Sequence, residues 1–205
     1  MALRSPSTPK PSTDLRLLDL AAEHVRRYGA ARLTVTEIAH AAGMSHANVY
    51  RYFRSKTALL EAVTATWLAP LEAGLRVIAD APDPAHDKLE RLLFAIHRAY
   101  RDKLATDPKI FDLFCVATAQ NAEIARRHQQ RIARAIQRIL DEGHGSGIYL
   151  INDQATAVNF VLDAMYRFLA PGTLRTDIDS PRDEIENRAS RLLNLVSQAL
   201  AHGDL

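Results

Sequence analysis

The segment from Thr34 to Phe53 limits the possible folds more than any other part of the chain. Thr34 and Glu37 form the pattern of a capping box, in which each side chain accepts a hydrogen bond from the backbone N–H of the other residue. Gly43 tolerates the positive φ that ends a short helix, and Ser45 is a favourable N-cap for the next one. The spacing therefore predicts two short helices joined by a tight turn, which is a helix-turn-helix unit.

The rest of the chain also predicts helices. Proline and glycine are sparse and fall at intervals of helix length, no segment alternates like a strand, and no internal repeat is present. The expected fold is all-α, with a three-helix head and a six-helix body. The nine helices are expected to begin near residues 13, 34, 45, 55, 85, 108, 121, 152 and 180. The last two are expected to run without interruption over about residues 152–170 and 180–202.

The net charge of +2 conceals an uneven distribution of charge. Residues 1–60 carry nine Lys and Arg against four Asp and Glu, whereas residues 61–205 carry seventeen against twenty. A basic head on a mildly acidic body fits a module that binds a polyanion, joined to a body that does not. The single cysteine excludes an internal disulfide, and the sequence has neither a membrane-spanning apolar run nor a signal-peptide core. We therefore expect a cytoplasmic protein.

The start of the predicted third helix carries side chains that a purely structural helix does not need. Ser45-His46-Ala47-Asn48 offers hydrogen-bonding groups and one small residue, without a long acid. Asn48 stands where a capping box would have Glu, and an Asn can pair bidentately with adenine in the major groove of DNA. Lys56, in the first turn of the next helix, opposes the helix dipole unless a phosphate neutralises it. These residues favour DNA binding over a helix-turn-helix that is only a structural corner.

A longer pattern spans these helices. It consists of Gly29, the run Leu33-Thr-Val-Thr-Glu-Ile-Ala39, the pair Ala42-Gly43, and Val49-Tyr-Arg-Tyr-Phe-x-Ser-Lys-x-x-Leu-Leu60. Over about residues 14–62 it closely resembles the N-terminal domain of tetracycline-repressor (TetR) type regulators. The body shares only the length and helical layout of that family. Val25 and Ala30 stand where the family usually has an aromatic residue, and both positions affect packing more than DNA contact.

The resemblance implies roles for individual residues. Ser45, His46, Ala47 and Asn48 would face the bases. The residues that would hold phosphates are Thr34, Thr36, Tyr50, Tyr52 and Lys56.

The resemblance also implies a function and a division of the chain. The protein would be a transcription regulator, more often a repressor in this family, that binds a palindromic operator as a homodimer and is released by a small-molecule ligand. Residues 1–12 would be a disordered basic tail, residues 13–60 the DNA-binding domain, and residues 61–205 the ligand-binding and dimerisation domain.

Aromatic and polar-tipped side chains recur on the inward faces of the predicted body helices. An apolar chamber with a few polar tips would suit a small apolar or amphipathic effector. The candidate ligand-binding residues are Trp67, Phe94, His97, Tyr100, Phe111, Phe114 and Cys115. Each of them can also be ordinary core, so the expectation of a cavity rests on the family resemblance. No cofactor is expected, and the eight histidines show no metal-ligand spacing.

Four arginines, Arg127, Arg131, Arg134 and Arg138, share one face of the predicted helix near residues 121–142. A solvated face, on which Glu123 pairs with Arg127 four residues on, is the favoured interpretation. An acidic ligand or a second DNA contact is the alternative.

The last two predicted helices carry apolar stripes that are wider than one packing partner requires. The stripes contain Val158, Leu162, Met165 and Leu169 on one helix, and Ile185, Leu192, Val196 and Ala199 on the other. We expect part of each stripe to meet a second subunit in a two-fold four-helix interface, with Leu192 and Val196 in the contact. The alternative is a monomer that buries both stripes in its own body.

Two other classes of protein are alternatives to a regulator. A small hydrolase could use Cys115 and His97, but the sequence has no glycine-rich phosphate loop, nucleophile elbow or paired acids to support it. A nucleoid protein that binds DNA without a ligand would lack preference for one operator.

Overall fold

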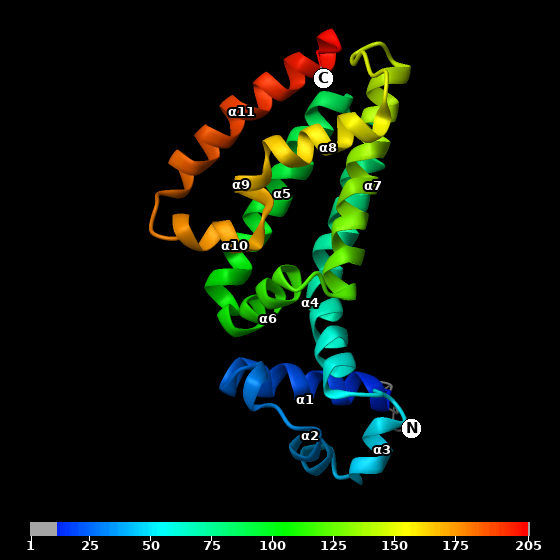
Figure 1. The fold of residues 1–205 in the computed structure, drawn as a ribbon, viewed down its shortest axis with the longest axis vertical. Helices are drawn as coiled ribbons and strands as arrows, with labels where there is room; N and C mark the ends of the chain where they lie inside the picture. The colour runs from blue at the N-terminus through cyan, green and yellow to red at the C-terminus, as the bar shows by residue number, and fades with distance from the viewer. Residues whose placement is uncertain (1–11, 205) are drawn as a thin grey trace, which may run out of the picture. The chain divides into compact units, whose positions relative to one another are not determined.

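The computed structural model describes residues 12–204, so the predicted tail of residues 1–12 lies outside the described residues except for Ser12. Within residues 12–204 every regular element is a helix and no strand occurs (Figure 1). The all-α prediction is therefore confirmed.

The chain divides into two compact units, the first ending at Thr64 and the second beginning at Ala65. Helix α4 (Lys56–Ala79) runs through this division, so its first turns belong to the first unit and the rest to the second.

The first unit is a small bundle around one apolar core. Its elements are α1 (Thr13–Tyr28), the 3-10 turn η1 (Ala30–Arg32), α2 (Val35–Ala42), α3 (His46–Tyr50) and the start of α4. Leu17, Ala21 and Val25 of α1 are fully buried and repeat at helical spacing. Val49, also fully buried, anchors α3. A helix of five residues is not stable alone, so this packing is what holds α3 in place.

The second unit contains most of the helices. They are α5 (Ala85–Thr106), α6 (Pro108–Ala119), α7 (Glu123–Gly145), α8 (Gln154–Ala164), α9 (Tyr166–Leu169), α10 (Pro171–Leu174), the 3-10 turn η2 (Arg175–Asp177) and α11 (Arg182–His202). Helix α5 packs against α6, α7 and α11, and α7 packs against α8. Leu89, Leu93 and Ile96 of α5 repeat at helical spacing and are at most 1% exposed, so this face of the helix lies in the core.

The prediction of one continuous helix over residues 152–170 is wrong, because two helices, α8 and α9, occupy this range and α10 follows it. Helix α8 ends at Ala164, because the φ of −91° and ψ of 4° at Met165 leave the helical range. A second break follows at Ala170, where the residue before Pro171 is extended, as steric contact with a proline ring requires. At the first break the sequence has neither proline nor glycine, but His97 Nδ1 of α5 donates a hydrogen bond to the carbonyl of Phe168, 3.0 Å away. The break between α8 and α9 therefore coincides with a tertiary contact between α9 and α5.

Candidate functional site

Hydrogen bonds between neighbouring residues position the helix-turn-helix. The Thr34 hydroxyl accepts from the Glu37 backbone N–H (3.2 Å), and the Glu37 carboxylate accepts from the Thr34 N–H (3.1 Å). This is the predicted capping box. Gly43 has the left-handed conformation (φ 68°, ψ 36°), and the Ser45 hydroxyl accepts from the Asn48 N–H at 3.3 Å. The turn and both helix starts are thus set by local chemistry, as predicted.

Helix α3 presents polar side chains away from its buried anchor. Ser45, His46 and Ala47 are exposed, and Asn48 is half-buried. Within residues 12–204 the Asn48 amide group makes no hydrogen bond, so its donor and acceptor are both available to a partner. The His46 ring lies edge-on to the Tyr50 ring, with 4.8 Å between centroids, which limits where the tyrosine can point.

The predicted phosphate-holding residues differ in how exposed they are and in how many hydrogen-bond donors they can offer to a phosphate. Tyr50 and Tyr52 are exposed at 39% and 45%, and Thr36 is also exposed. The Lys56 ammonium donates to the Ala31 carbonyl at 3.0 Å, which leaves two of its three N–H groups for a phosphate. The Thr34 hydroxyl already donates to Glu37 Oε2 at 2.7 Å, so it has no second proton to offer.

Arg51 and Arg54 lie beside Tyr50 and Tyr52 at a spacing that suits phosphate contacts, although the predicted phosphate-holding set does not include them. Both side chains are exposed, and neither forms an ion pair within the part of the chain that the structure describes. Two free guanidinium groups beside the exposed tyrosines give this end of the first unit its positive charge. Their signal in the sequence was the basic run around Phe53, which alone does not distinguish solvated cations from phosphate contacts.

The structure separates the seven predicted ligand-binding residues into groups. Trp67, Tyr100, Phe111 and Phe114 form one aromatic cluster, in which ring centroids lie 5.6–6.4 Å apart. Phe94 and His97 do not join it. The Phe94 ring lies beneath the Arg98 guanidinium, and the His97 ring packs against Phe168. They face differently because they lie on α5 at positions off the stripe that carries Tyr100. Cys115 is half-buried, and burial raises the pKa of its thiol to about 11.

A cavity of about 610 Å³ opens beside the aromatic cluster. Tyr100 and Phe114 are the two predicted residues that line it. Its other apolar lining comes from Ile132, Leu162, Leu169 and Pro171, and its polar lining includes Asn121, Gln129 and Tyr166. A mixed lining of this kind suits a ligand with an apolar part and a polar end.

A chain of hydrogen bonds leads from this cavity to α4. The Tyr100 hydroxyl and His128 Nε2 are 2.7 Å apart, and His128 Nδ1 lies 2.8 Å from the Glu72 carboxylate. Tyr100 and His128 are each 1% exposed. Because a carboxylate only accepts, His128 Nδ1 carries a proton, and a neutral His128 then accepts the Tyr100 hydroxyl proton at Nε2. Burial opposes ionisation of Glu72, but hydrogen bonds from His128 and Arg131 outweigh it and lower its pKa.

Sequence reasoning missed His128, although a signal was present. It stands four residues from both Ile124 and Ile132, on the buried stripe of α7. A polar residue at an apolar position of an amphipathic helix indicates a buried partner.

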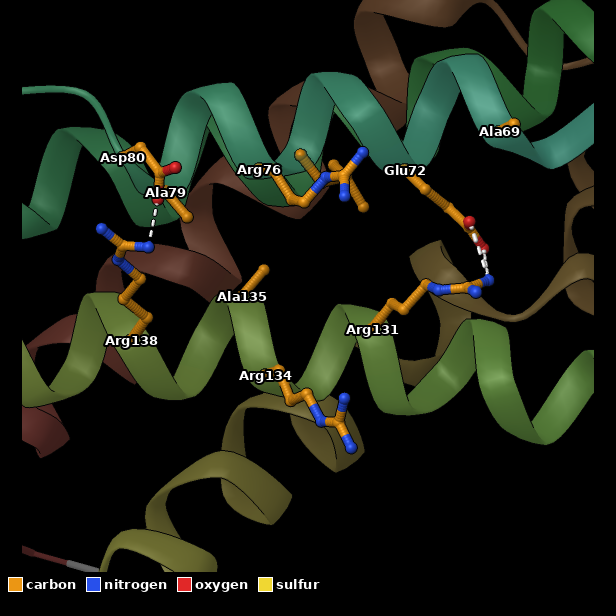
Figure 2. A pocket seen from close by; sticks show the side chains of 10 residues that line it. Ala69, Glu72, Arg76, Ala79, Asp80, Arg131, Arg134, Ala135 and Arg138 are labelled. Carbon is orange, nitrogen blue, oxygen red and sulfur yellow. Dashed lines mark hydrogen bonds and ion pairs between the residues drawn. The ribbon is translucent and has the colours of Figure 1, made fainter.

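The arginine face of α7 is only partly a solvated surface. The predicted pair forms, with Arg127 Nε 2.7 Å from Glu123. Arg131, Arg134 and Arg138 instead line a cleft between α7 and α4. Figure 2 shows that Arg131 and Arg138 reach toward α4, whereas the Arg134 side chain points away from it. Among residues 12–204, no cluster of His, Cys, Asp or Glu has the arrangement of a metal site. None of the helices described is long and apolar enough to cross a membrane.

Two family profiles match the chain. One, described as "Bacterial regulatory proteins, tetR family", matches residues 17–63. The other, described as "Tetracyclin repressor-like, C-terminal domain", matches residues 85–193. No curated protein matches the chain significantly.

Solved structures with the same fold span nearly the whole chain. A TetR/AcrR-family transcriptional regulator from Thermobifida fusca is 23% identical, covering 88% of this chain and 95% of its own, with a TM-score of 0.63. FadR from Bacillus subtilis, solved in complex with stearoyl-CoA, is 19% identical over 89% of this chain and 97% of its own, with a TM-score of 0.64. A protein from Rhodococcus sp. RHA1 is 20% identical over 96% and 100%, with a TM-score of 0.66. At these identities the likeness shows the fold.

The C-terminal profile alone covers more than half of the chain, and the N-terminal profile covers the capped helix-turn-helix. The chain therefore belongs to the TetR family of DNA-binding transcription regulators.

Proposed function

We propose that the protein is a repressor that binds a near-palindromic operator as a homodimer and leaves it when a small molecule occupies the 610 Å³ cavity. The observation that carries this proposal is the start of α3, where His46, Ala47 and Asn48 project from a helix that Ser45 caps and the buried Val49 anchors. A structural helix gains nothing from an unpaired amide at this position, whereas a helix that enters the major groove does.

The proposed DNA contacts divide into two groups. Ser45, His46, Ala47 and Asn48 read base edges, and Asn48 pairs with an adenine. Tyr50, Tyr52 and Lys56 hold phosphates, and Arg51 and Arg54 join them because they are exposed and unpaired among the described residues. Thr36 belongs to the same group. Thr34 would belong to the phosphate-holding group only if its hydroxyl donated to a phosphate-bound water instead of to Glu37.

The proposed effector is amphipathic. Phe114, Ile132 and Leu162 would contact its apolar part, and Tyr100 would offer its hydroxyl oxygen as an acceptor to a polar group. The related fold of FadR was solved with stearoyl-CoA, a molecule that also joins an apolar chain to a polar head. Binding at Tyr100 would act on Glu72 of α4 through His128, and α4 also carries Lys56. Effector binding would then favour a state of the dimer whose two heads no longer fit successive major grooves.

The proposed dimer interface differs from the expectation drawn from the sequence, because Val158, Met165, Ile185 and Val196 of the expected stripes are buried. Val196 is 2% exposed and packs in the core of its own chain, so it is not free to meet a partner. Leu195, one residue earlier on α11, is 62% exposed, and Leu192 and Ala199 on the same side are half-buried. We propose that these three residues, with Phe160 of α8, form the contact between subunits. In this proposal residues 13–60 bind DNA, and residues 61–205 bind the effector and form the dimer.

Selection of bound duplexes from a random pool tests the DNA-binding proposal. We expect one near-palindromic sequence whose affinity falls steeply with rising salt, because several phosphates are neutralised. Recovery of no duplex at low salt would refute the DNA-binding proposal. Recovery of bound duplexes that share no common sequence would indicate a nucleoid protein.

A screen of small molecules by thermal shift, followed by operator-release assays, tests the effector proposal. We expect stabilising ligands to lower operator affinity in the wild-type protein, because coupling requires different affinities for the two states. Tyr100→Phe should weaken binding of the same ligands while leaving operator affinity intact. Ligands that stabilise the protein and leave the operator bound would show that cavity and DNA binding are not coupled.

A further inference from the structure

The hydrogen bonds that join Tyr100, His128 and Glu72 run in one direction. A carboxylate only accepts, so His128 donates from Nδ1 to Glu72 and accepts the Tyr100 hydroxyl proton at Nε2. Burial raises the pKa of Tyr100, so its hydroxyl keeps that proton. A tyrosine hydroxyl has a single proton to donate, and here it is committed to His128. Only the acceptor side of the Tyr100 oxygen is left for a ligand.

The charge balance around Glu72 keeps His128 neutral. Arg131 Nη1 lies 2.9 and 2.8 Å from the two carboxylate oxygens of Glu72, and Figure 2 shows this ion pair. Glu72 and Arg131 therefore neutralise each other. A second proton on His128, which is 1% exposed, would be a buried charge without a counter-ion of its own.

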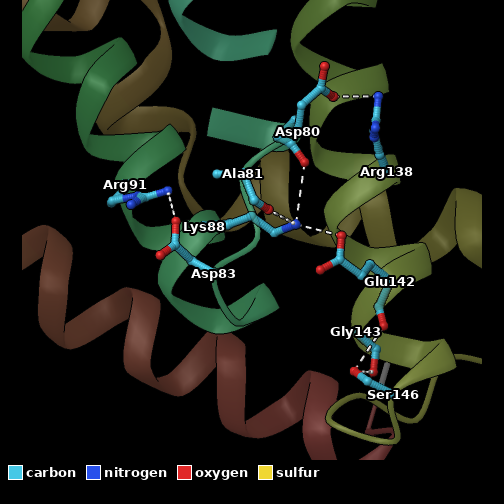
Figure 3. Close-up of polar contacts among 10 residues, drawn as sticks. Asp80, Ala81, Asp83, Lys88, Arg91, Arg138, Glu142, Gly143 and Ser146 are labelled. Carbon is cyan, nitrogen blue, oxygen red and sulfur yellow. Dashed lines mark hydrogen bonds and ion pairs between the residues drawn. The ribbon is translucent and has the colours of Figure 1, made fainter. Parts of the chain in front are cut away.

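Helices α4 and α7, which carry Glu72 and His128, are held together without a ligand. At the end of α4 the fully buried Lys88 donates to the carbonyls of Ala79 and Ala81 at 3.3 and 3.1 Å (Figure 3). It also pairs with a carboxylate of α7, that of Glu142. The direction of the hydrogen bonds is therefore set before a ligand binds, and a preformed site can select among ligands.

The Tyr100 end of these hydrogen bonds lies at the wall of the effector cavity. Tyr100 and His128 both line the cavity, and the atoms that join them are the hydroxyl oxygen and Nε2. The ring of Phe114, which also lines it, has its centroid 5.6 Å from that of Tyr100 and 5.5 Å from that of His128. A ligand group that reaches this wall leaves water for apolar neighbours, so an unmatched polar atom there is costly.

We propose that this arrangement restricts the effector to molecules whose buried polar group is a neutral hydrogen-bond donor, such as an alcohol or an amide N–H. Glu72, which is not among the cavity-lining residues, sets this specificity as a positioning residue. The proposal rests on the effector cavity of the proposed function and names the class of ligand that it takes. An ether, ester or carboxylate oxygen would face the Tyr100 oxygen as a second acceptor, with no proton between them.

Two isomeric probes test this specificity in the full chain. Decanol carries a hydroxyl donor, whereas nonyl methyl ether has the same atoms but only an acceptor. Binding is followed by the fluorescence of Trp67, the only tryptophan, whose ring centroid lies 6.1 Å from that of Phe114. The measured quantity is the ratio of the two affinities, compared between variants because the ether is also the more hydrophobic probe.

Glu72→Gln should shift this ratio about tenfold in favour of the ether, the effect of one buried hydrogen bond. Arg131 attracts the carbonyl oxygen of the new amide, so its NH₂ group turns to His128 and donates to Nδ1. His128 then carries its proton on Nε2 and donates to the Tyr100 oxygen. The Tyr100 proton becomes free for an acceptor on the ligand. An unchanged ratio in this variant, with the fold intact by circular dichroism, would overturn the proposal.

Asp83→Asn is the matched control. It also replaces a carboxylate by an amide, but Asp83 pairs with Arg91 at 2.6 Å, as Figure 3 shows, and neither residue lines the cavity. We expect the wild-type ratio in this variant. A shift as large as that in Glu72→Gln would show that net charge selects the ligand, and failure of both probes to bind the wild type would show that the ligand class is wrong.

Nitrogen NMR of the ligand-free chain gives a second readout that needs neither ligand nor DNA. The imidazole signals of His128, assigned by their loss in His128→Gln, distinguish a proton on Nδ1 from one on Nε2. We expect Nδ1 in wild type and Nε2 in Glu72→Gln. A wild-type ring protonated on Nε2, or on both nitrogens, would overturn the proposal. A ratio that shifts as expected, while decanol leaves the operator bound, would support this specificity and refute only the coupling in the proposed function.

Discussion

Gly143→Ala should destabilise the second unit, although alanine is the better helix former. Gly143 lies in α7, where Ala stabilises a helix by about 0.5–1 kcal/mol relative to Gly. A Cβ added at this position would lie 2.2 Å from Tyr149 Cδ2 and 3.1 Å from the Ala85 Cβ. Tyr149 and Ala85 are each 1% exposed, so neither side chain can move into solvent. The close approach of the Tyr149 ring to the backbone therefore requires glycine here.

The magnitude follows from the two opposing effects. Overpacking a filled core costs about 1–3 kcal/mol, and a contact as short as this belongs at the upper end. After the helix-propensity gain, we expect Gly143→Ala to lower the free energy of unfolding by about 2 kcal/mol. For a chain of this size that is a fall of roughly 4–8 °C in the melting temperature measured by calorimetry.

Gly74→Ala is the matched control. Gly74 also lies inside a helix, α4, but a Cβ there would meet nothing within 4 Å. We expect this variant to be more stable than wild type by about 0.5–1 kcal/mol. Tyr149→Leu should cost less in the Gly143→Ala background than in wild type, because it removes the obstructing ring. If the two glycine variants are equally stable, Tyr149 does not pack on Gly143 and the reasoning fails.

Four further predictions concern single side chains. Asn48→Ala should cost about 1–3 kcal/mol of discrimination at one half-site position, whereas Lys56→Ala should weaken binding to every sequence and reduce the salt slope; a uniform loss in both variants would contradict this division of roles. Leu195→Glu should give monomers in sedimentation experiments with unchanged helical content, and persistence of the dimer would place the interface elsewhere. Burial lowers the pKa of His97 below its ordinary value of 6.5. His97 is therefore protonated more readily in the unfolded chain than in the folded protein. The free energy of unfolding should therefore be constant above about pH 6.5 and decrease below it. In urea titrations His97→Gln should reduce this decrease. A pH profile that is the same in the variant and in wild type would contradict the prediction. Because the Cys115 thiol has a pKa of about 11, its alkylation by iodoacetamide at pH 7 should be on the order of a hundredfold slower than that of a free cysteine, and rapid labelling would indicate a different environment.

The sequence by itself determined the helix-turn-helix. Its signals are contacts between residues three apart, such as Thr34 with Glu37 and Ser45 with Asn48, together with the left-handed Gly43. Such contacts form within one helical turn, so they do not depend on how the rest of the chain packs. For the same reason the helical class of the body was predictable from spacing and from its sparse prolines and glycines.

Only the tertiary structure decided how the body helices use their side chains. Tyr100 and His128 are 28 residues apart, and His128 and Glu72 are 56 apart, so no local pattern announces their hydrogen bonds. The break after α8 and the burial of Val196 in place of Leu195 likewise depend on which neighbour packs against each face. Periodicity identifies an apolar stripe, but the partner that covers each residue is set by long-range packing, which decides whether a side chain lines a cavity, a core or a subunit contact.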